Sequence, residues 1–140
     1  MRKSKILSML RSYPWRKHNV EYVILFGSAV YSSSPRDIDI AVKFGNYSFE
    51  KYLSILEGVS SYLKVAEDKI DIIPLDSEDL PAQLILEIYC KGVLLYCADF
   101  NRFLNEALRR INISYDFLLT CRKVKCFEAL LREVKKSWES

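Results

Sequence analysis

The chain has 140 residues, of which 50% are hydrophobic and 28% are charged, and its formal net charge is +3. This composition is typical of a folded globular protein and excludes a disordered chain. The net charge is too small to argue for nucleic-acid binding, and no apolar run approaches the roughly 20 residues of a membrane span. We therefore expect one domain spanning residues 1–140, located in the cytoplasm.

The residues that commonly bind zinc are few and badly spaced. The four cysteines lack paired C-x-x-C spacing, and His18 is the only histidine. A zinc site is therefore not favoured, and the cysteines are expected to be reduced and mostly buried, with a disulfide left open for a hyperthermophilic source. We expect His18 to lie at the surface.

The first half of the chain alternates between helical and strand patterns. Apolar residues at helical spacing indicate a short helix around 6–10, which Pro14 ends. The continuous apolar runs 22–26 and 38–42 indicate buried strands, and Gly27 and Ser28 mark a turn that leads into a short helix. An apolar stripe predicts a helix over 49–63, with Ser48 as its N-cap.

The second half repeats the alternation and then becomes helical throughout. We expect strands over 70–75 and 93–97, separated by a helix that starts near Pro81 and stops at Gly92. From Asp99 to about Trp138 the pattern predicts a helix, with a weak point at 112–114 where it could bend or split. The expected fold is α/β or α+β: a mixed sheet of about four strands flanked by helices, with a core over residues 20–97 and a helical extension over 99–138.

Three aspartates stand out because of the strands that carry them. Asp37 and Asp39 are two residues apart, so their side chains project from one face, whereas Ile38 and Ile40 face the core. Asp71 lies within the apolar run 70–75, where a charged side chain is costly without compensation. Magnesium bound by the three carboxylates would relieve both the repulsion and the burial cost, and three carboxylates suffice for two ions.

The turn before these acids has the chemistry of a phosphate site. Gly27 allows a close approach to a phosphate, while Ser28 adds a hydroxyl and a backbone N–H. Arg36 could neutralise phosphate, although an exposed arginine without a role explains it equally well. Taken singly, Asp-x-Asp also fits a solvated strand edge, Gly27-Ser28 fits an ordinary tight turn, and Asp71 could pair with Lys69.

The ordered set Gly-Ser, Asp-x-Asp and a later lone Asp resembles the DNA polymerase β-like nucleotidyltransferase superfamily. The segments Lys-Ile-Asp-Ile-Ile-Pro-Leu and Ile-Leu-Glu-Ile-Tyr-Cys-Lys-Gly-Val-Leu-Leu-Tyr look like its minimal branch, the MntA-type antitoxins. This resemblance implies a polymerase β-like fold and magnesium-dependent transfer of AMP from ATP to a hydroxyl, with a tyrosine of a HepT-like helical toxin as the acceptor. It places phosphate at Gly27 and Ser28, metal at Asp37, Asp39 and Asp71, and the orientation of the attacking hydroxyl at Asp71.

The loop after Gly27-Ser28 departs from the family pattern. Residues 29–34 contain neither the arginine nor the glycine usual there, and Arg36 stands where serine is common. An alternative function is therefore a catalytically weakened binding module that neutralises its partner sterically. A third is an enzyme that acts on a small molecule or an RNA end.

Overall fold

The computed structural model describes residues 2–139, and a four-stranded sheet lies at its centre with the strand order β3-β2-β1-β4. Its strands are β1 (Tyr22–Phe26), β2 (Ile38–Lys43), β3 (Ile70–Pro74) and β4 (Val93–Cys97). Strand β1 pairs antiparallel with β2 and β4, whereas β2 pairs parallel with β3. The predicted mixed sheet is therefore confirmed.

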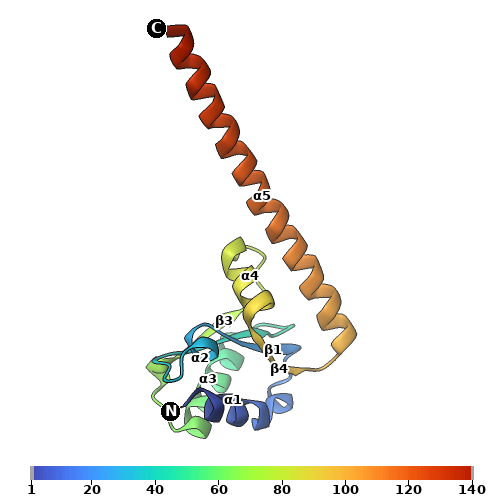
Figure 1. Ribbon diagram of the computed structural model, residues 1–140. Helices are drawn as coiled ribbons and strands as arrows, with labels where there is room; N and C mark the ends of the chain where they lie inside the picture. Colours follow the sequence, from blue (N-terminus) through green and yellow to red (C-terminus); the bar gives the residue numbers. More distant parts are fainter. Residues whose placement is uncertain (1, 140) are drawn as a thin grey trace.

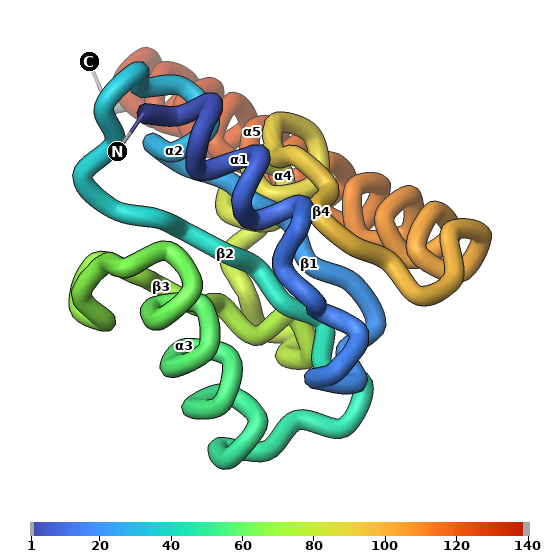
Figure 2. Tube along the Cα trace, turned by 90° about the horizontal axis from the view of Figure 1, so that it is seen from below, coloured from blue at the N-terminus to red at the C-terminus, as the bar shows by residue number. Residues whose placement is uncertain are grey.

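Helices cover both faces of this sheet, and Figure 1 shows their arrangement. The α-helices are α1 (Lys3–Ser12), α2 (Ser28–Tyr31), α3 (Phe49–Leu63), α4 (Ala82–Lys91) and α5 (Phe100–Glu139), and two 3-10 turns are η1 (Trp15–His18) and η2 (Glu67–Lys69). Helices α1 and α3 lie together on one face (Figure 2), while α4 and the first half of α5 lie on the other. As predicted, Ser48 caps α3, because its hydroxyl accepts the Lys51 N–H.

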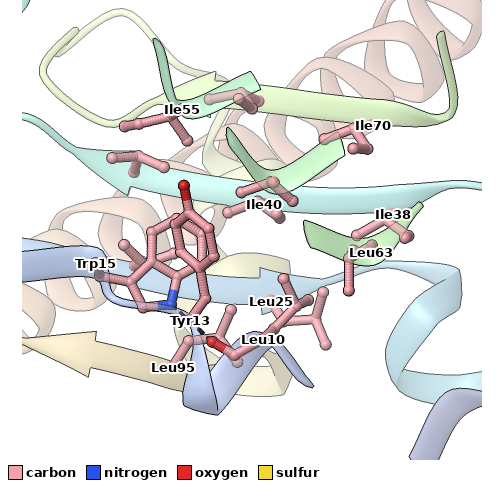
Figure 3. Packing of buried hydrophobic residues seen from close by; sticks show 14 of the residues in the cluster. Leu10, Tyr13, Trp15, Leu25, Ile38, Ile40, Ile55, Leu63, Ile70 and Leu95 are labelled. Atoms are coloured by element: carbon pink, nitrogen blue, oxygen red, sulfur yellow. Dashed lines mark hydrogen bonds between the residues drawn. The ribbon is translucent and has the colours of Figure 1, made fainter. Parts of the chain in front are cut away.

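The larger part of the core lies between the sheet and the α1–α3 layer (Figure 3). Alternate residues of β2 point into it, so Ile38 and Ile40 are fully buried. The side chain of Trp15 closes the end of this core, and its indole Nε1–H donates to the Leu10 carbonyl at 2.8 Å. The buried face of β2 orients its opposite face, which carries Asp39, away from this core.

His18 was predicted at the surface, and this prediction is wrong. Its side chain is only 9% exposed and lies 2.7 Å from the Tyr13 hydroxyl through Nε2. Burial, and then the charge of Lys17, lowers the pKa of His18 below its ordinary value. The polar ring is tolerated inside because it has a hydrogen-bonding partner, which no local sequence pattern reveals.

Helix α5 is continuous over its 40 residues, so the predicted weak point at 112–114 does not break it. The low helix propensities of asparagine, isoleucine and serine cost only a few tenths of a kcal/mol each. Ser114 is buried, and this packing stabilises the helix across the weak point. Beyond that point α5 extends away from the rest of the fold (Figure 1).

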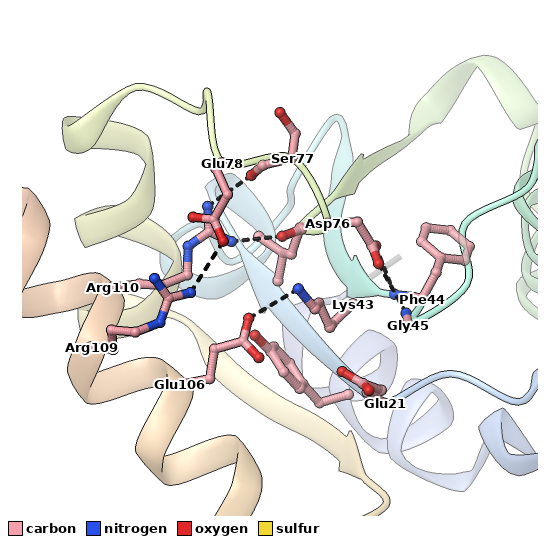
Figure 4. Close-up of polar contacts among 12 residues, drawn as sticks. Glu21, Lys43, Phe44, Gly45, Asp76, Ser77, Glu78, Glu106, Arg109 and Arg110 are labelled. Atoms are coloured by element: carbon pink, nitrogen blue, oxygen red, sulfur yellow. Dashed lines mark hydrogen bonds and ion pairs between the residues drawn. The ribbon is translucent and has the colours of Figure 1, made fainter.

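Polar contacts attach the first half of α5 to the sheet (Figure 4). The guanidinium of Arg110 is buried and donates to the Leu75 carbonyl at 2.6 Å and to the Ser77 carbonyl at 2.9 Å. The Lys43 ammonium forms an ion pair with the Glu106 carboxylate at 3.2 Å. These contacts set the position of α5 over the sheet face that carries Asp39.

We expect the substitution Arg110→Ala to lower the free energy of unfolding by about 3 kcal/mol, because it leaves the buried Leu75 carbonyl without its charged donor. Urea unfolding followed by circular dichroism measures the change. Arg109→Ala is the matched control, since its ion pair with Glu78 is exposed and contributes less than about 0.5 kcal/mol. Equal losses in the two variants would contradict the assigned role of Arg110.

Two further expectations concern cysteines and membranes. All four cysteines are free thiols, as predicted, but Cys90 and Cys126 are exposed and Cys97 and Cys121 are partly exposed, so the prediction that they are mostly buried is wrong. Within residues 2–139, no helix combines the length and the apolar character needed to cross a membrane.

Candidate functional site

Asp39 and Asp71 lie directly opposite one another on neighbouring strands. The parallel register of β2 and β3 pairs Asp39 with Asp71, and the antiparallel register of β1 and β2 pairs Phe26 with Asp39. Both carboxylates project from the sheet face opposite the buried Ile38 and Ile40. Asp37 lies one residue before β2, so the alternation of this strand places Asp39 on that face but does not place Asp37 there.

The electrostatics of Asp39 show how closely these acids interact. Burial, followed by the interactions with Asp71, Asp37 and Glu87 in that order, raises the pKa of Asp39 to about 6. Asp39 is only partly exposed, whereas Asp37 and Asp71 are exposed. The site therefore concentrates negative charge around one half-buried carboxylate.

Glu87 was not singled out from the sequence. It lies on α4, one residue before the buried Ile88, and its charge acts on Asp39 across the sheet face. The sequence pattern of an amphipathic helix predicts that a single glutamate on its polar face is exposed to solvent. Only the packing of α4 over β1 brings it to the aspartates, so no sequence signal could have found it.

The acids have no basic partner in the part of the chain that the structure describes. None of its ion pairs includes Asp37, Asp39, Asp71 or Glu87, so the alternative pairing of Asp71 with Lys69 is not formed. Across residues 2–139, no three His, Cys, Asp or Glu side chains gather closely enough to hold a metal ion. The structure thus brings Asp39 and Asp71 together but does not gather all three predicted ligands into one cluster. Negatively charged carboxylates repel one another when no cation lies between them, so this separation is the expected one.

Gly27 ends β1 directly beside Asp39. Its φ of +74° and ψ of −150° belong to a region that glycine alone adopts readily. A Cβ atom at this position would lie 2.3 Å from the Asp39 Oδ2 atom. The glycine is therefore required both by the turn and by the close approach of the carboxylate.

Ser28 and Arg36 lie on the segment that connects β1 to β2. The Ser28 hydroxyl donates to the Asp37 carbonyl at 3.1 Å, which joins the Gly27 turn to the start of β2. Helix α2 begins at Ser28, as expected, but has only four residues. Arg36 is exposed and forms none of the ion pairs within residues 2–139.

A cleft of about 490 Å³ opens between α2, α4 and α5. Tyr31, Gln83, Glu87, Lys91 and Tyr115 are among its lining residues. Glu87 connects this cleft to the aspartates, because it lines the cleft and also acts on Asp39. The site is thus an acidic group connected through Glu87 to an open cleft with aromatic and basic walls.

Residues 5–101 match the family model described as "Polymerase beta, Nucleotidyltransferase". The chain belongs to this nucleotidyltransferase family. The matched region contains Gly27, Ser28 and all three aspartates. No match is found among curated proteins.

Solved structures similar to this nucleotidyltransferase are toxin–antitoxin complexes. A mutant of the MntA–HpeT toxin–antitoxin has 20% identity and a TM-score of 0.58, covering 93% of this chain and 99% of that chain. A toxin–antitoxin with AMP-PNP has 22% identity and a TM-score of 0.58 with the same coverage.

A third similar structure holds a modified toxin. It is a tri-AMPylated Shewanella oneidensis HEPN toxin in complex with MNT antitoxin, with 22% identity and a TM-score of 0.54, covering 91% of this chain and 95% of that chain. At these identities the likeness concerns the fold, and it confirms the predicted nucleotidyltransferase architecture of minimal size.

Proposed function

We propose that this nucleotidyltransferase is a cytoplasmic, magnesium-dependent enzyme that transfers AMP from ATP to a hydroxyl group. The observation that carries the proposal is the pair Asp39 and Asp71, which lies beside Gly27 and within the electrostatic influence of Glu87 from the cleft. The proposed acceptor is a tyrosine of a HepT-like helical toxin. This choice is supported by the similar structures, one of which contains an AMPylated toxin.

Magnesium fits the donor set of the site. Its carboxylates have no basic partner among residues 2–139, and burial, followed by the neighbouring carboxylates, raises the pKa of Asp39. Carboxylate oxygens are the ligands that magnesium prefers, so Asp37, Asp39 and Asp71 would hold it, as two ions in our proposal. When bound, magnesium would neutralise charge on the phosphates of ATP.

The other residues of the site would bind and orient the reactants. The Gly27 backbone and the Ser28 hydroxyl would contact the phosphates, with Arg36 adding positive charge from the same segment. The cleft would hold the rest of the nucleotide, and Tyr31 and Tyr115 on its walls offer flat surfaces for stacking.

The proposed transfer forms one bond and breaks one bond. The acceptor oxygen attacks the α-phosphorus of ATP, and the bond from that phosphorus to the bridging oxygen of the β-phosphate breaks, which releases pyrophosphate. Asp71 is exposed at the site and would accept the proton of the attacking hydroxyl. The product is a phosphodiester between AMP and the acceptor.

We expect incubation of the chain with the purified product of its neighbouring gene, magnesium and ATP to label the neighbour. Label on the α-phosphate should transfer, whereas label on the γ-phosphate should not, because a nucleotidyltransferase keeps the first and releases the second. Mass spectrometry should find added AMP on a tyrosine. Transfer of the γ-label, or no transfer in either reaction, would refute the proposal; a stable complex without transfer would favour the binding-module alternative.

A further inference from the structure

From Ile113 onward, α5 carries a regular apolar stripe whose side chains are largely exposed. We define the apolar stripe as Ile113, Phe117, Val124, Phe127, Leu131, Val134 and Trp138. Each of these side chains is at least 45% exposed, and Trp138 is 83% exposed. Proteins that act alone rarely expose apolar surface in one continuous patch of this kind.

The spacing of the stripe is that of a helix built to contact another helix. Its residues alternate in steps of three and four, and the only polar residue in this series is Thr120. Such a seven-residue repeat keeps the side chains on one side of a helix. From Val124 to Trp138 the stripe runs for about 21 Å along a segment that extends beyond the sheet and the other helices (Figure 1).

The stripe begins at a pocket in the body of the fold. Ile113 and Phe117 line a cavity of about 370 Å³ between α4 and α5, together with Leu80 and Ile85. On another side of α5, Tyr115 lines the cleft that Glu87 also lines. A partner seated along the stripe would therefore reach the fold next to the candidate site.

The side chains of the stripe fit a different protein better than a second copy of this chain. Three of the seven residues are aromatic, and paired copies would stack phenylalanine or tryptophan in layers that coiled coils fill with aliphatic side chains. The segment 119–139 is also basic, which opposes self-association. It contains Arg122, Lys123, Lys125, Arg132, Lys135 and Lys136 against Glu128, Glu133 and Glu139.

A membrane surface fits less well than a protein groove. On a helix that lies on lipid, basic side chains flank the apolar face and reach the headgroups. Here only Lys123 and Lys135 lie about 60° to either side of the centre of the stripe, where they can face the rim of a groove. The other four basic residues of the segment lie about 120–160° from that centre, on the far side of the helix: Arg122, Lys125, Arg132 and Lys136. Aromatic anchors on a helix are instead typical of a helix that binds in a protein groove.

We propose that the apolar stripe is the docking surface for a separate helical protein that presents an apolar groove with an acidic rim. This inference rests on the proposed function in one respect: the docked protein is the acceptor of AMP. The stripe then binds the acceptor along the part of α5 that extends beyond the sheet, while the cleft lined by Tyr115 binds the nucleotide.

The test compares two serine substitutions at equally exposed leucines of the full chain. Leu131→Ser lies on the stripe, and Leu119→Ser lies about 120° around the same helix; the two leucines are 50% and 49% exposed. We expect Leu131→Ser to weaken binding of the neighbouring gene product about 10-fold by calorimetry, and the double variant Phe127→Ser/Leu131→Ser to weaken it about 100-fold. Leu119→Ser should change the dissociation constant less than about 3-fold.

Separate measurements distinguish failure of docking from failure of the proposed function. AMP transfer by the double variant should recover at saturating acceptor, because the stripe affects KM rather than kcat. Equal binding by wild type and double variant, or no complex with the wild type, would overturn the docking proposal even if transfer occurs. If the wild-type chain alone forms dimers and the double variant does not, the stripe binds a second copy and the proposal is overturned. If the wild-type chain binds anionic vesicles and the double variant does not, the stripe binds a membrane and the proposal is likewise overturned. Tight binding without transfer would refute only the proposed function.

Discussion

Replacing Asp39 with asparagine should abolish AMP transfer and, without divalent cations, should make the fold more stable. Asp39 is the half-buried acid among its neighbours, and burial together with the charges of Asp71, Asp37 and Glu87 raises its pKa to about 6. Asparagine removes the charge at nearly the same volume. We expect a loss of transfer of at least about 1,000-fold, since a metal-binding carboxylate is lost.

The stability gain follows from the same charges. At pH 8, Asp39→Asn should raise the free energy of unfolding by about 1 kcal/mol, a value already reduced for solvent screening. Because the pKa of Asp39 is higher in the folded state than its ordinary value of 3.8, the folded state takes up the proton first. The contribution of Asp39 to stability should therefore rise as the pH falls from about 7 to about 4.

Thermal melts in EDTA and in magnesium separate these effects. Magnesium should raise the melting temperature of the wild type and leave that of Asp39→Asn unchanged, because a ligand stabilises only the state that binds it. Glu57→Gln removes a similar charge from an exposed position on α3, on the opposite face of the sheet, and should keep both transfer and the magnesium response. An Asp39→Asn variant that melts lower than the wild type in EDTA would contradict the electrostatic account of the site.

The strands of the sheet could be predicted closely because strong local signals bound them. The strand over 22–26 ends at Gly27 and the strand over 93–97 follows Gly92, so both were predicted at their observed bounds. The physical role of Gly92 was not predictable. Its φ is −77°, and a Cβ atom there would lie 2.3 Å from the Ile88 carbonyl oxygen and 2.5 Å from Ile24 Cγ2, so close packing requires the glycine.

Three features could not be predicted from the sequence, because each depends on contacts between segments that are distant along the chain. His18 is buried because Tyr13 reaches it and α3 packs against η1. Glu87 joins the acids only through the packing of α4, and α5 is continuous through 112–114, where Ser114 is buried. The common face of Asp39 and Asp71 was predictable because alternation along β2 and β3 assigns each side chain to a face before any tertiary contact is known, whereas Asp37 precedes β2 and escapes this rule.

Gly27→Ala should disable the site while leaving its aspartates in place. A Cβ atom at Gly27 would lie 2.3 Å from the Asp39 Oδ2 atom, so the Asp39 carboxylate or the turn must move. The φ of +74° adds strain of about 1–3 kcal/mol for alanine. We expect AMP transfer to fall about 100-fold, because displacement of a catalytic group by about 1 Å costs a factor of that size.

Gly45→Ala is the matched control for backbone strain. Gly45 also has a positive φ, +82°, but its neighbours are the Glu21 side chain at 3.3 Å and the Asp76 carboxylate, which accepts its N–H. Urea unfolding should show both variants losing stability, whereas a transfer assay should show only Gly27→Ala losing activity at a temperature where both are folded. Equal activity in the two variants would mean that the Gly27 turn serves the fold alone. A selective loss would instead show that its contact with the Asp39 carboxylate sets the geometry of the site, since both glycines have a positive φ but only Gly27 approaches Asp39.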